Sequence, residues 1–208
     1  MRHGFEEAWR RLGAGHVPEF AAIAACYSEP HRAYHTLEHL RDCLEWLAVS
    51  QQLAQRPLEV KLALVYHDAV YVPQRSDNEV RSAELFRAHA RASRLADGPT
   101  ERIAALIEGT ALHRAQNKDG ALLNDIDLAV LGSSPHRFAR YERQIREEYG
   151  HVDQRLFHAG RERILRAFLE AAAIYETSFF SQRLEAQAHG NLSRALLTLQ
   201  NAGRVEQL

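Results

Sequence analysis

The chain has 208 residues, of which 46% are hydrophobic and 25% are charged, a composition typical of a globular protein long enough to bury a substantial core. Its 26 basic and 27 acidic side chains leave a formal net charge of −1, which argues against a general nucleic-acid binder. The two cysteines, Cys26 and Cys43, match no zinc-type spacing. No apolar stretch approaches the roughly 20 residues that span a bilayer. With no apolar signal core near Met1, we expect a cytoplasmic protein without a membrane partner.

Helical periodicity dominates the first half of the chain. Apolar spacing and proline positions predict helices over about residues 5–12, 18–27, 36–55 and 57–68. The third of these carries leucines at spacings of 3, 4 and 3. Asp77 is a plausible N-cap for a further helix, and Pro99 and Thr100 begin another. We expect a polar loop over residues 114–120.

The second half continues in the same manner. An apolar run over residues 122–131 ends at Gly132, a favourable residue after a helix. Helices are predicted over about residues 135–149, 153–175 and 184–199. No strand-like alternation, internal repeat or interdomain linker stands out. The sequence therefore predicts one all-α domain over residues 1–208, whose last helix packs either within the domain or across a homodimer.

Histidines and carboxylates gather in three separate helical segments. His35 and His39 are about 40° apart around an ideal helix, so both are able to face one cavity. His67 and Asp68 form an adjacent doublet at a predicted helix end. Asp125 and Asp127 are about 200° apart, so we expect only one of them to bind an ion on that side. This mixed nitrogen and oxygen set predicts one or two divalent ions, of Mn, Fe, Zn, Ni or Mg.

This pattern resembles the HD superfamily of metal-dependent phosphohydrolases. The family's ordered ligands, a His, the His-Asp doublet and a distal Asp, match His39, His67-Asp68 and Asp127. A bacterial branch with no assigned substrate is also similar, through the segments Tyr34–His39, His67–Tyr71, Asp77–Ala83, Thr110–His113, Leu128–Gly132 and Gly160-Arg161. The resemblance covers roughly residues 27 to 200. It implies a metal-site core over about residues 30–132, followed by C-terminal helices over about 135–200.

The resemblance, together with the position and chemistry of each residue, indicates a role for every site residue. His39, His67, Asp68 and Asp127 hold the metal, and His35, catalytic together with Asp68, donates a proton to the leaving oxygen. A second metal or a substrate phosphate is assigned to His113, Arg114 and Lys118. Asp77, Glu79 and Asp125 are expected to orient the ligands or a water molecule without binding the metal themselves. The implied substrate is a small phosphorylated molecule, with a nucleotide as the leading class.

Three other functions compete with this interpretation. Residues 35–39 also fit the H-x-x-E-H motif of zinc peptidases, in which Glu38 would be the general base. That motif leaves the His-Asp doublet and Asp127 unexplained. The metal site would also suit a regulatory module that binds a nucleotide without turnover. A di-iron oxygenase would use both His35 and His113 as additional ligands.

Overall fold

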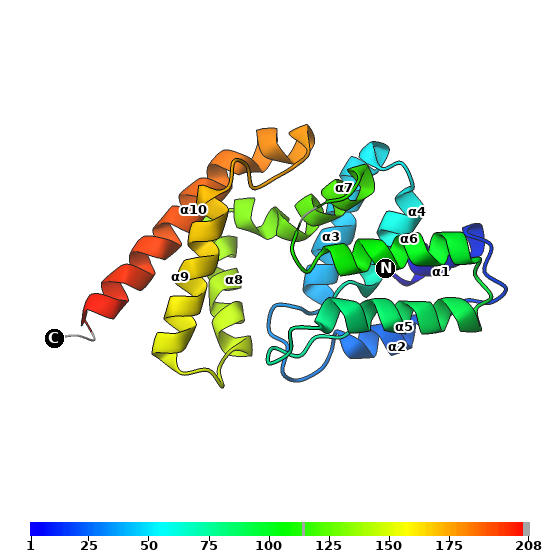
Figure 1. Cartoon of the computed structure of the whole chain (residues 1–208), viewed down its shortest axis with the longest axis horizontal. Coiled ribbons are helices and arrows are strands. Elements are labelled where there is room, and N and C mark those ends of the chain that lie inside the picture. The colour runs from blue at the N-terminus through cyan, green and yellow to red at the C-terminus, as the bar shows by residue number, and fades with distance from the viewer. Residues whose placement is uncertain (114, 206–208) are drawn as a thin grey trace. The chain divides into compact units, whose positions relative to one another are not determined.

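A computed structural model describes residues 1–113 and 115–205 of the chain. Within these residues it contains ten α-helices and two short 3-10 helices, and no strand (Figure 1). The predicted all-α class is therefore confirmed. Two compact units can be distinguished, Met1–Asp127 and Leu128–Leu208. That the whole chain forms one domain stays a prediction.

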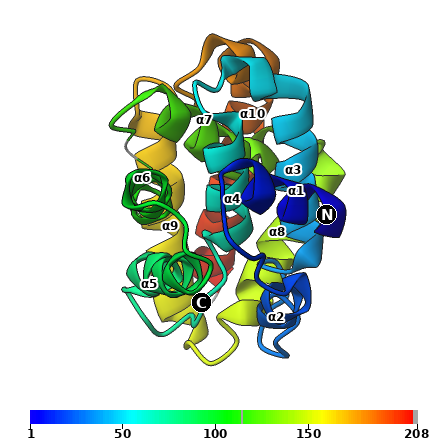
Figure 2. The same cartoon turned by 90° about the vertical axis from the view of Figure 1, so that its right-hand side faces the viewer.

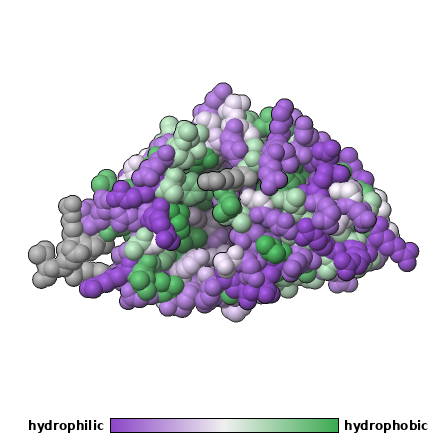
Figure 3. Space-filling model, viewed as in Figure 1, coloured by the Kyte–Doolittle hydropathy of each residue, from purple (hydrophilic) through white to green (hydrophobic). Residues whose placement is uncertain are grey.

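Seven α-helices and one 3-10 helix build the first unit. They are α1 (Arg2–Arg11), α2 (Phe20–Cys26), α3 (Leu37–Ser50), η1 (Gln51–Leu53), α4 (Pro57–Tyr66), α5 (Asn78–Ala92), α6 (Asp97–Gly109) and α7 (Lys118–Asp127). Helices α5 and α6 lie side by side in both views (Figures 1 and 2). Hydrophilic residues predominate on the surface of this unit that faces the viewer in Figure 3. No helix in the described part of the chain has the length and apolar character needed to cross a bilayer.

Helix α4 is the centre of the first unit. It contacts α1, α3, α5, α6 and α7, and its side chains from Leu62 to Tyr66 are all buried. This burial on every side explains why its sequence is a continuous apolar run rather than an amphipathic stripe. The doublet His67-Asp68 follows directly after its last residue. The most rigid element of the unit therefore positions the candidate metal ligands.

The predicted loop over residues 114–120 is wrong in its second half, because α7 already begins at Lys118. The carboxylate of Asp119 accepts hydrogen bonds from the backbone N–H groups of Gln55, at 2.6 Å, and of Arg56, at 3.2 Å. This contact joins the first turn of α7 to the segment before α4. Such a long-range contact leaves no mark in local sequence periodicity.

The second unit consists of η2 (Leu128–Gly132), α8 (Pro135–Glu148), α9 (Gln154–Glu170) and α10 (Ser178–Val205). The prediction that one helix reaches Tyr175 is wrong, since α9 ends at Glu170. The backbone N–H groups of Ile174 and Tyr175 instead donate to the carboxylate of Glu185 on α10. The last helix begins at Ser178, six residues before the predicted start at Leu184.

Gly132 lies in a tight contact inside the second unit. A Cβ atom at this position would be 2.5 Å from Leu184 Cβ and 2.9 Å from the Tyr175 hydroxyl oxygen. We expect Gly132→Ala to lower the free energy of unfolding by about 1–3 kcal/mol, because neither neighbour has room to move freely. Gly160, inside α9, has no atom within 4 Å of such a Cβ, so Gly160→Ala should stabilise the protein by about 1 kcal/mol. Urea unfolding of both variants checks the opposite signs; equal midpoints would contradict this packing.

Candidate metal centre

Four predicted ligands converge at one point of the first unit. His39 lies in the first turn of α3, His67 and Asp68 follow α4, and Asp127 ends α7. The Nε2 atom of His39 is 3.2 Å from His67 Nε2, 3.4 Å from Asp68 Oδ2 and 3.2 Å from Asp127 Oδ1. His67 Nε2 is 2.9 Å from Asp68 Oδ2 and 3.4 Å from Asp127 Oδ1. Three segments that are far apart in sequence thus bring two nitrogens and two oxygens together.

These separations fit a shared divalent ion. For ligand distances of about 2.0–2.2 Å, neighbouring donor atoms lie about 3.0 Å apart in an octahedron and about 3.4 Å apart in a tetrahedron. The five measured separations, from 2.9 to 3.4 Å, cover this range. The two histidines are almost fully buried, whereas Asp68 and Asp127 are partly exposed. A site with buried nitrogens and accessible oxygens leaves room for a substrate.

The ring of His67 is oriented for metal binding. Its Nδ1 atom is 2.8 Å from the carbonyl oxygen of Leu64. A carbonyl only accepts a hydrogen bond, so Nδ1 carries the hydrogen and the neutral ring presents the lone pair of Nε2 to the cluster. The last turn of α4 therefore fixes the tautomer that a metal ion requires.

Cys43 joins this cluster, although sequence spacing did not indicate it. The donor atoms of His39, Cys43, His67 and Asp127 all lie within 4.8 Å of one another. The sulfur is 3.7 Å from both ring nitrogens of His39, and it therefore lies over the ring face rather than along the Nε2 lone pair. The only sequence signal is its position one helical turn after His39. We expect Cys43 to pack against the ligand, while Asp68 provides the closer donor atom.

His113 contacts the outer oxygen of Asp127. Its Nε2 atom is 3.2 Å from Asp127 Oδ2, and its backbone has a positive φ of 45°. A residue other than glycine rarely adopts this conformation, which is found disproportionately at functional sites. Arg114, predicted to act with His113, lies outside the described residues. Lys118 is exposed at the start of α7.

His35 lies beside the ligands without being one of the four. Its ring is stacked on Tyr71, with centroids 3.9 Å apart and planes at 28°, and its centroid is 5.9 Å from that of His39. The ring is half-buried. Stacking on a buried aromatic side chain restricts the imidazole. The role of His35 as proton donor stays a prediction.

The three carboxylates predicted to support the ligands lie in different environments. The carboxylate of Asp77 accepts hydrogen bonds from Arg75, at 2.6 and 2.7 Å, and from Arg81, at 2.9 Å, so these surface arginines hold it. Glu79 is half-buried in the first turn of α5. Asp125 is fully buried on α7. For the last two, support of the ligands stays a prediction.

Arg32 is a component of the site that sequence reasoning missed. Its side chain has no exposed surface. Its Nη1 atom donates to the carbonyl oxygens of His35, at 3.1 Å, and Asp68, at 2.7 Å, and its Nη2 atom donates to that of Ala69, at 3.1 Å. The guanidinium also lies over the rings of Tyr27 and Tyr71. One buried cation thus ties the segment before α3 to the His-Asp doublet.

Two polar side chains of α5 hold the loop that follows the doublet. The Asn78 amide accepts from the backbone N–H of Val72 and donates to its carbonyl oxygen, both at 3.0 Å. The Ser82 hydroxyl does the same with Val70, at 3.0 and 3.2 Å. Both residues belong to the segment Asp77–Ala83 that carried the family resemblance. They place the loop that bears Tyr71.

Neighbouring groups raise the pKa of both buried histidines. Burial alone lowers the pKa of His39, but Cys43 and Tyr34, followed by the two carboxylates, outweigh it, and the pKa lies well above the ordinary 6.5. Burial likewise lowers the pKa of His67, and the Asp68 carboxylate contributes most to the opposite shift. Without a metal, these rings therefore tend to carry protons at neutral pH.

The same interactions act in the opposite direction on the carboxylates. Burial raises the pKa of Asp68, but His67 and then His35 outweigh it, leaving the pKa well below 3.8. Burial also raises the pKa of Asp127, and His67 together with His113 brings it well below the same ordinary value. Both carboxylates are therefore ionised over the whole physiological pH range, as metal binding requires.

These shifts predict opposite pH dependences with and without metal. In the metal-free protein the raised histidine pKa adds stability that is complete below pH 6.5 and is lost as the pH rises through the folded-state pKa. The lowered carboxylate pKa adds stability above pH 3.8 that is lost on acidification. The chelator-treated protein should therefore melt at a higher temperature at pH 5.5 than at pH 8. Metal binding displaces the histidine protons, so stabilisation by added Zn²⁺ or Mn²⁺ should be larger at pH 8. A higher melting temperature at pH 8 in chelator would contradict the assignment.

Comparisons with protein-family models, with curated proteins and with solved structures gave no match. The similarity to HD phosphohydrolases thus depends on the sequence motifs. The all-helical fold and the His, Cys, His and Asp cluster are compatible with an HD-type fold.

Proposed function

We propose that this chain is a metal-dependent phosphohydrolase that cleaves a phosphoester or phosphoanhydride. The observation that carries the proposal is the convergence of His39, His67, Asp68 and Asp127: the two histidine nitrogens lie 2.9 to 3.4 Å from each other and from an oxygen of each aspartate. Two imidazole nitrogens and two carboxylate oxygens suit a first-row transition metal or Mg²⁺. A bound divalent ion would supply a water of lowered pKa as the nucleophile at neutral pH.

His35 is the residue we assign as proton donor to the leaving oxygen. It is held against Tyr71 beside the cluster, in the turn that precedes α3, four residues before the ligand His39. An imidazole exchanges protons near neutral pH, which matches this task. Arg32 bonds the carbonyl oxygens of both His35 and Asp68, so the donor and a ligand share one fixed support. The spacing between acid and ligand is thereby set by a buried contact.

His113 extends the site beyond the four proposed ligands. Because it bonds one oxygen of Asp127 while the other oxygen faces His39 and His67, Asp127 is able to serve two neighbouring positions. We propose that His113 contacts either a second ion or a phosphate oxygen of the substrate. A nucleotide, as the family resemblance implies, is the substrate class to examine first.

Metal content and phosphate release, measured on the same samples, test this function. Wild-type protein should carry one or two equivalents of metal by elemental mass spectrometry and release phosphate from a panel of nucleotides. Asp68→Asn should lose both, whereas Asp97→Asn, at an exposed position on α6, should lose neither. His35→Gln should keep its metal, but its rate of phosphate release should fall by about a hundredfold or more.

Two outcomes would overturn the proposal. Failure to bind Mn, Fe, Zn or Ni after reconstitution would show that the cluster is structural. Tight binding of metal and nucleotide without phosphate release from any nucleotide tested would favour the regulatory module. A Glu38→Gln control addresses the peptidase, which alone would lose its general base through that change.

A further inference from the structure

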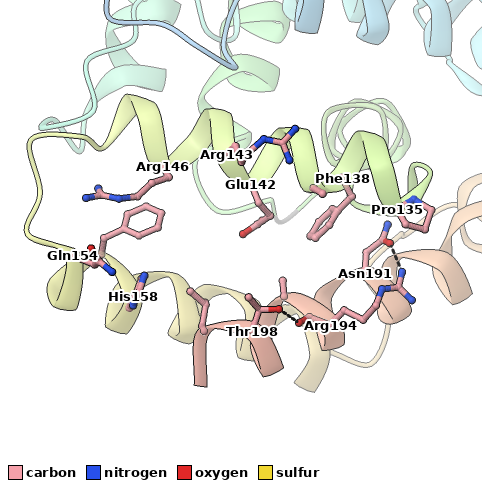
Figure 4. A pocket seen from close by; sticks show the side chains of 14 residues that line it. Pro135, Phe138, Glu142, Arg143, Arg146, Gln154, His158, Asn191, Arg194 and Thr198 are labelled. Atoms are coloured by element: carbon pink, nitrogen blue, oxygen red, sulfur yellow. Dashed lines mark hydrogen bonds between the residues drawn. The ribbon is translucent and has the colours of Figure 1, made fainter. Parts of the chain in front are cut away.

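A cavity of about 590 Å³ lies within the second unit, between α8 on one side and α9 and α10 on the other (Figure 4). This volume falls in the range of small-molecule sites. Its walls are mainly apolar, with Phe138 of α8, Phe157 of α9, and Ala195 and Leu199 of α10 among them. The cavity shares no residue with the His and Asp cluster of the first unit. A separate ligand is needed to explain it.

Three arginines line this cavity, Arg143, Arg146 and Arg194, and the last two donate to neutral oxygens. Arg146 lies over the Phe157 ring at 4.8 Å and donates to the carbonyl oxygens of Tyr149 and Val152. Arg194, on α10, donates to the amide oxygen of Asn191 at 2.7 Å. Figure 4 shows these two arginines toward opposite ends of the cavity. Because amide oxygens satisfy hydrogen bonds without neutralising charge, both side chains remain sources of positive potential.

The acidic side chain among the described residues of the lining does not offset them. Glu142 accepts hydrogen bonds from Arg161, which also bonds the hydroxyl of Tyr141. Arg161 is buried, so this pair is fixed and its charges cancel locally. The cavity thus combines apolar walls with a net positive charge. An uncharged or cationic ligand would not neutralise that charge, whereas an anion would.

We propose that this cavity binds an amphipathic anion, an alkyl chain that carries one carboxylate or phosphate head. The chain lies against the apolar walls, and the head binds Arg194. Arg194 is a better anchor than Arg146, because Arg194 is exposed and has a single side-chain acceptor among the described residues. Arg146 already uses both terminal nitrogens on carbonyl oxygens. This proposal does not depend on the phosphohydrolase function.

Calorimetric titration with matched probes tests the proposal without any turnover. Decanoate and monodecyl phosphate, below their micelle concentrations, distinguish the two head groups, and 1-decanol and acetate supply the chain and the head alone. We expect one equivalent of at least one decyl anion to bind. Both 1-decanol and acetate should bind at least about tenfold more weakly than the decyl anions. A factor of ten corresponds to the loss of about one charge-assisted hydrogen bond.

Two pairs of variants locate the site. Arg194→Gln should weaken anion binding about tenfold, whereas Arg183→Gln should not, since Arg183 lies on the same helix but donates to Phe179 O outside the cavity. Ala195→Trp should abolish binding by filling the cavity, and Ser193→Trp, its exposed neighbour, should not. Circular dichroism confirms that each variant is folded.

Three results would overturn the proposal. Equal affinity for 1-decanol and the anions would show an apolar cavity without anion recognition. Binding that survives Ala195→Trp would place the ligand elsewhere. Absence of binding by every probe would also contradict it. If, in addition, Ala195→Trp sediments differently from the wild-type protein, the apolar walls form a contact between two copies of the chain.

Discussion

Replacement of Asp127 by asparagine is expected to remove most of the divalent metal that the protein binds. Oδ1 of Asp127 lies 3.2 Å from His39 Nε2 and 3.4 Å from His67 Nε2. Asparagine has nearly the same shape but no charge, so the change removes an anionic ligand and leaves the packing almost intact. Since even residues that only support ligands contribute 10- to 100-fold to metal affinity, we expect a loss of about a hundredfold or more. Competition with a chelating dye measures it directly.

Two further variants make this result specific. His113→Gln removes the neighbour of the outer oxygen, Oδ2, and should leave the ion between His39 and His67 in place. Asp125→Asn alters the carboxylate two residues earlier, which is fully buried. That change should lower the melting temperature and cost less metal affinity than Asp127→Asn, because a residue that only supports the ligands contributes about 10- to 100-fold. A large loss of affinity with Asp125→Asn and none with Asp127→Asn would reverse the assignment of the two aspartates.

Local sequence signals were sufficient for most helix positions, and the four residues that the family resemblance singled out as ligands lie close together. Pro57 marks the first residue of α4, and Thr36 caps α3 by accepting a hydrogen bond from the Glu38 N–H, both as residue preferences predict. His39 lies in the first turn of α3, and the doublet follows directly after α4. Their mutual approach then depends on how these two helices pack.

Contacts between distant segments were beyond the reach of that reasoning. Arg32 precedes the first histidine motif in a stretch with no periodicity, and only the folded backbone brings the carbonyl oxygens of Asp68 and Ala69 to it. Asp77 looked like a helix cap and a candidate support, yet its side chain makes no capping bond and instead binds Arg75 and Arg81. Arg32 was missed because its partners are distant in sequence, whereas Asp77 was misassigned because two arginines within four residues compete with the backbone for its carboxylate.

The structural role of Arg32 leads to the second large expected effect. Arg32→Met keeps the length of the side chain but removes the donors that bond the carbonyl oxygens of His35, Asp68 and Ala69. Leaving buried acceptors without donors costs about 1–3 kcal/mol each before relaxation. We therefore expect the free energy of unfolding, measured with urea in chelator, to fall by about 3 kcal/mol or more.

Glu29→Gln separates the backbone contacts of Arg32 from its ion pair. The Glu29 carboxylate accepts from Arg32 Nε at 2.9 Å but is 44% exposed, and such pairs contribute at most about 1 kcal/mol. We expect this variant to unfold close to wild type and to retain its metal. Arg32→Met should also bind metal more weakly, because Asp68 is then free to shift its backbone. If both variants unfold alike, the ion pair rather than the three carbonyl contacts holds the doublet in place.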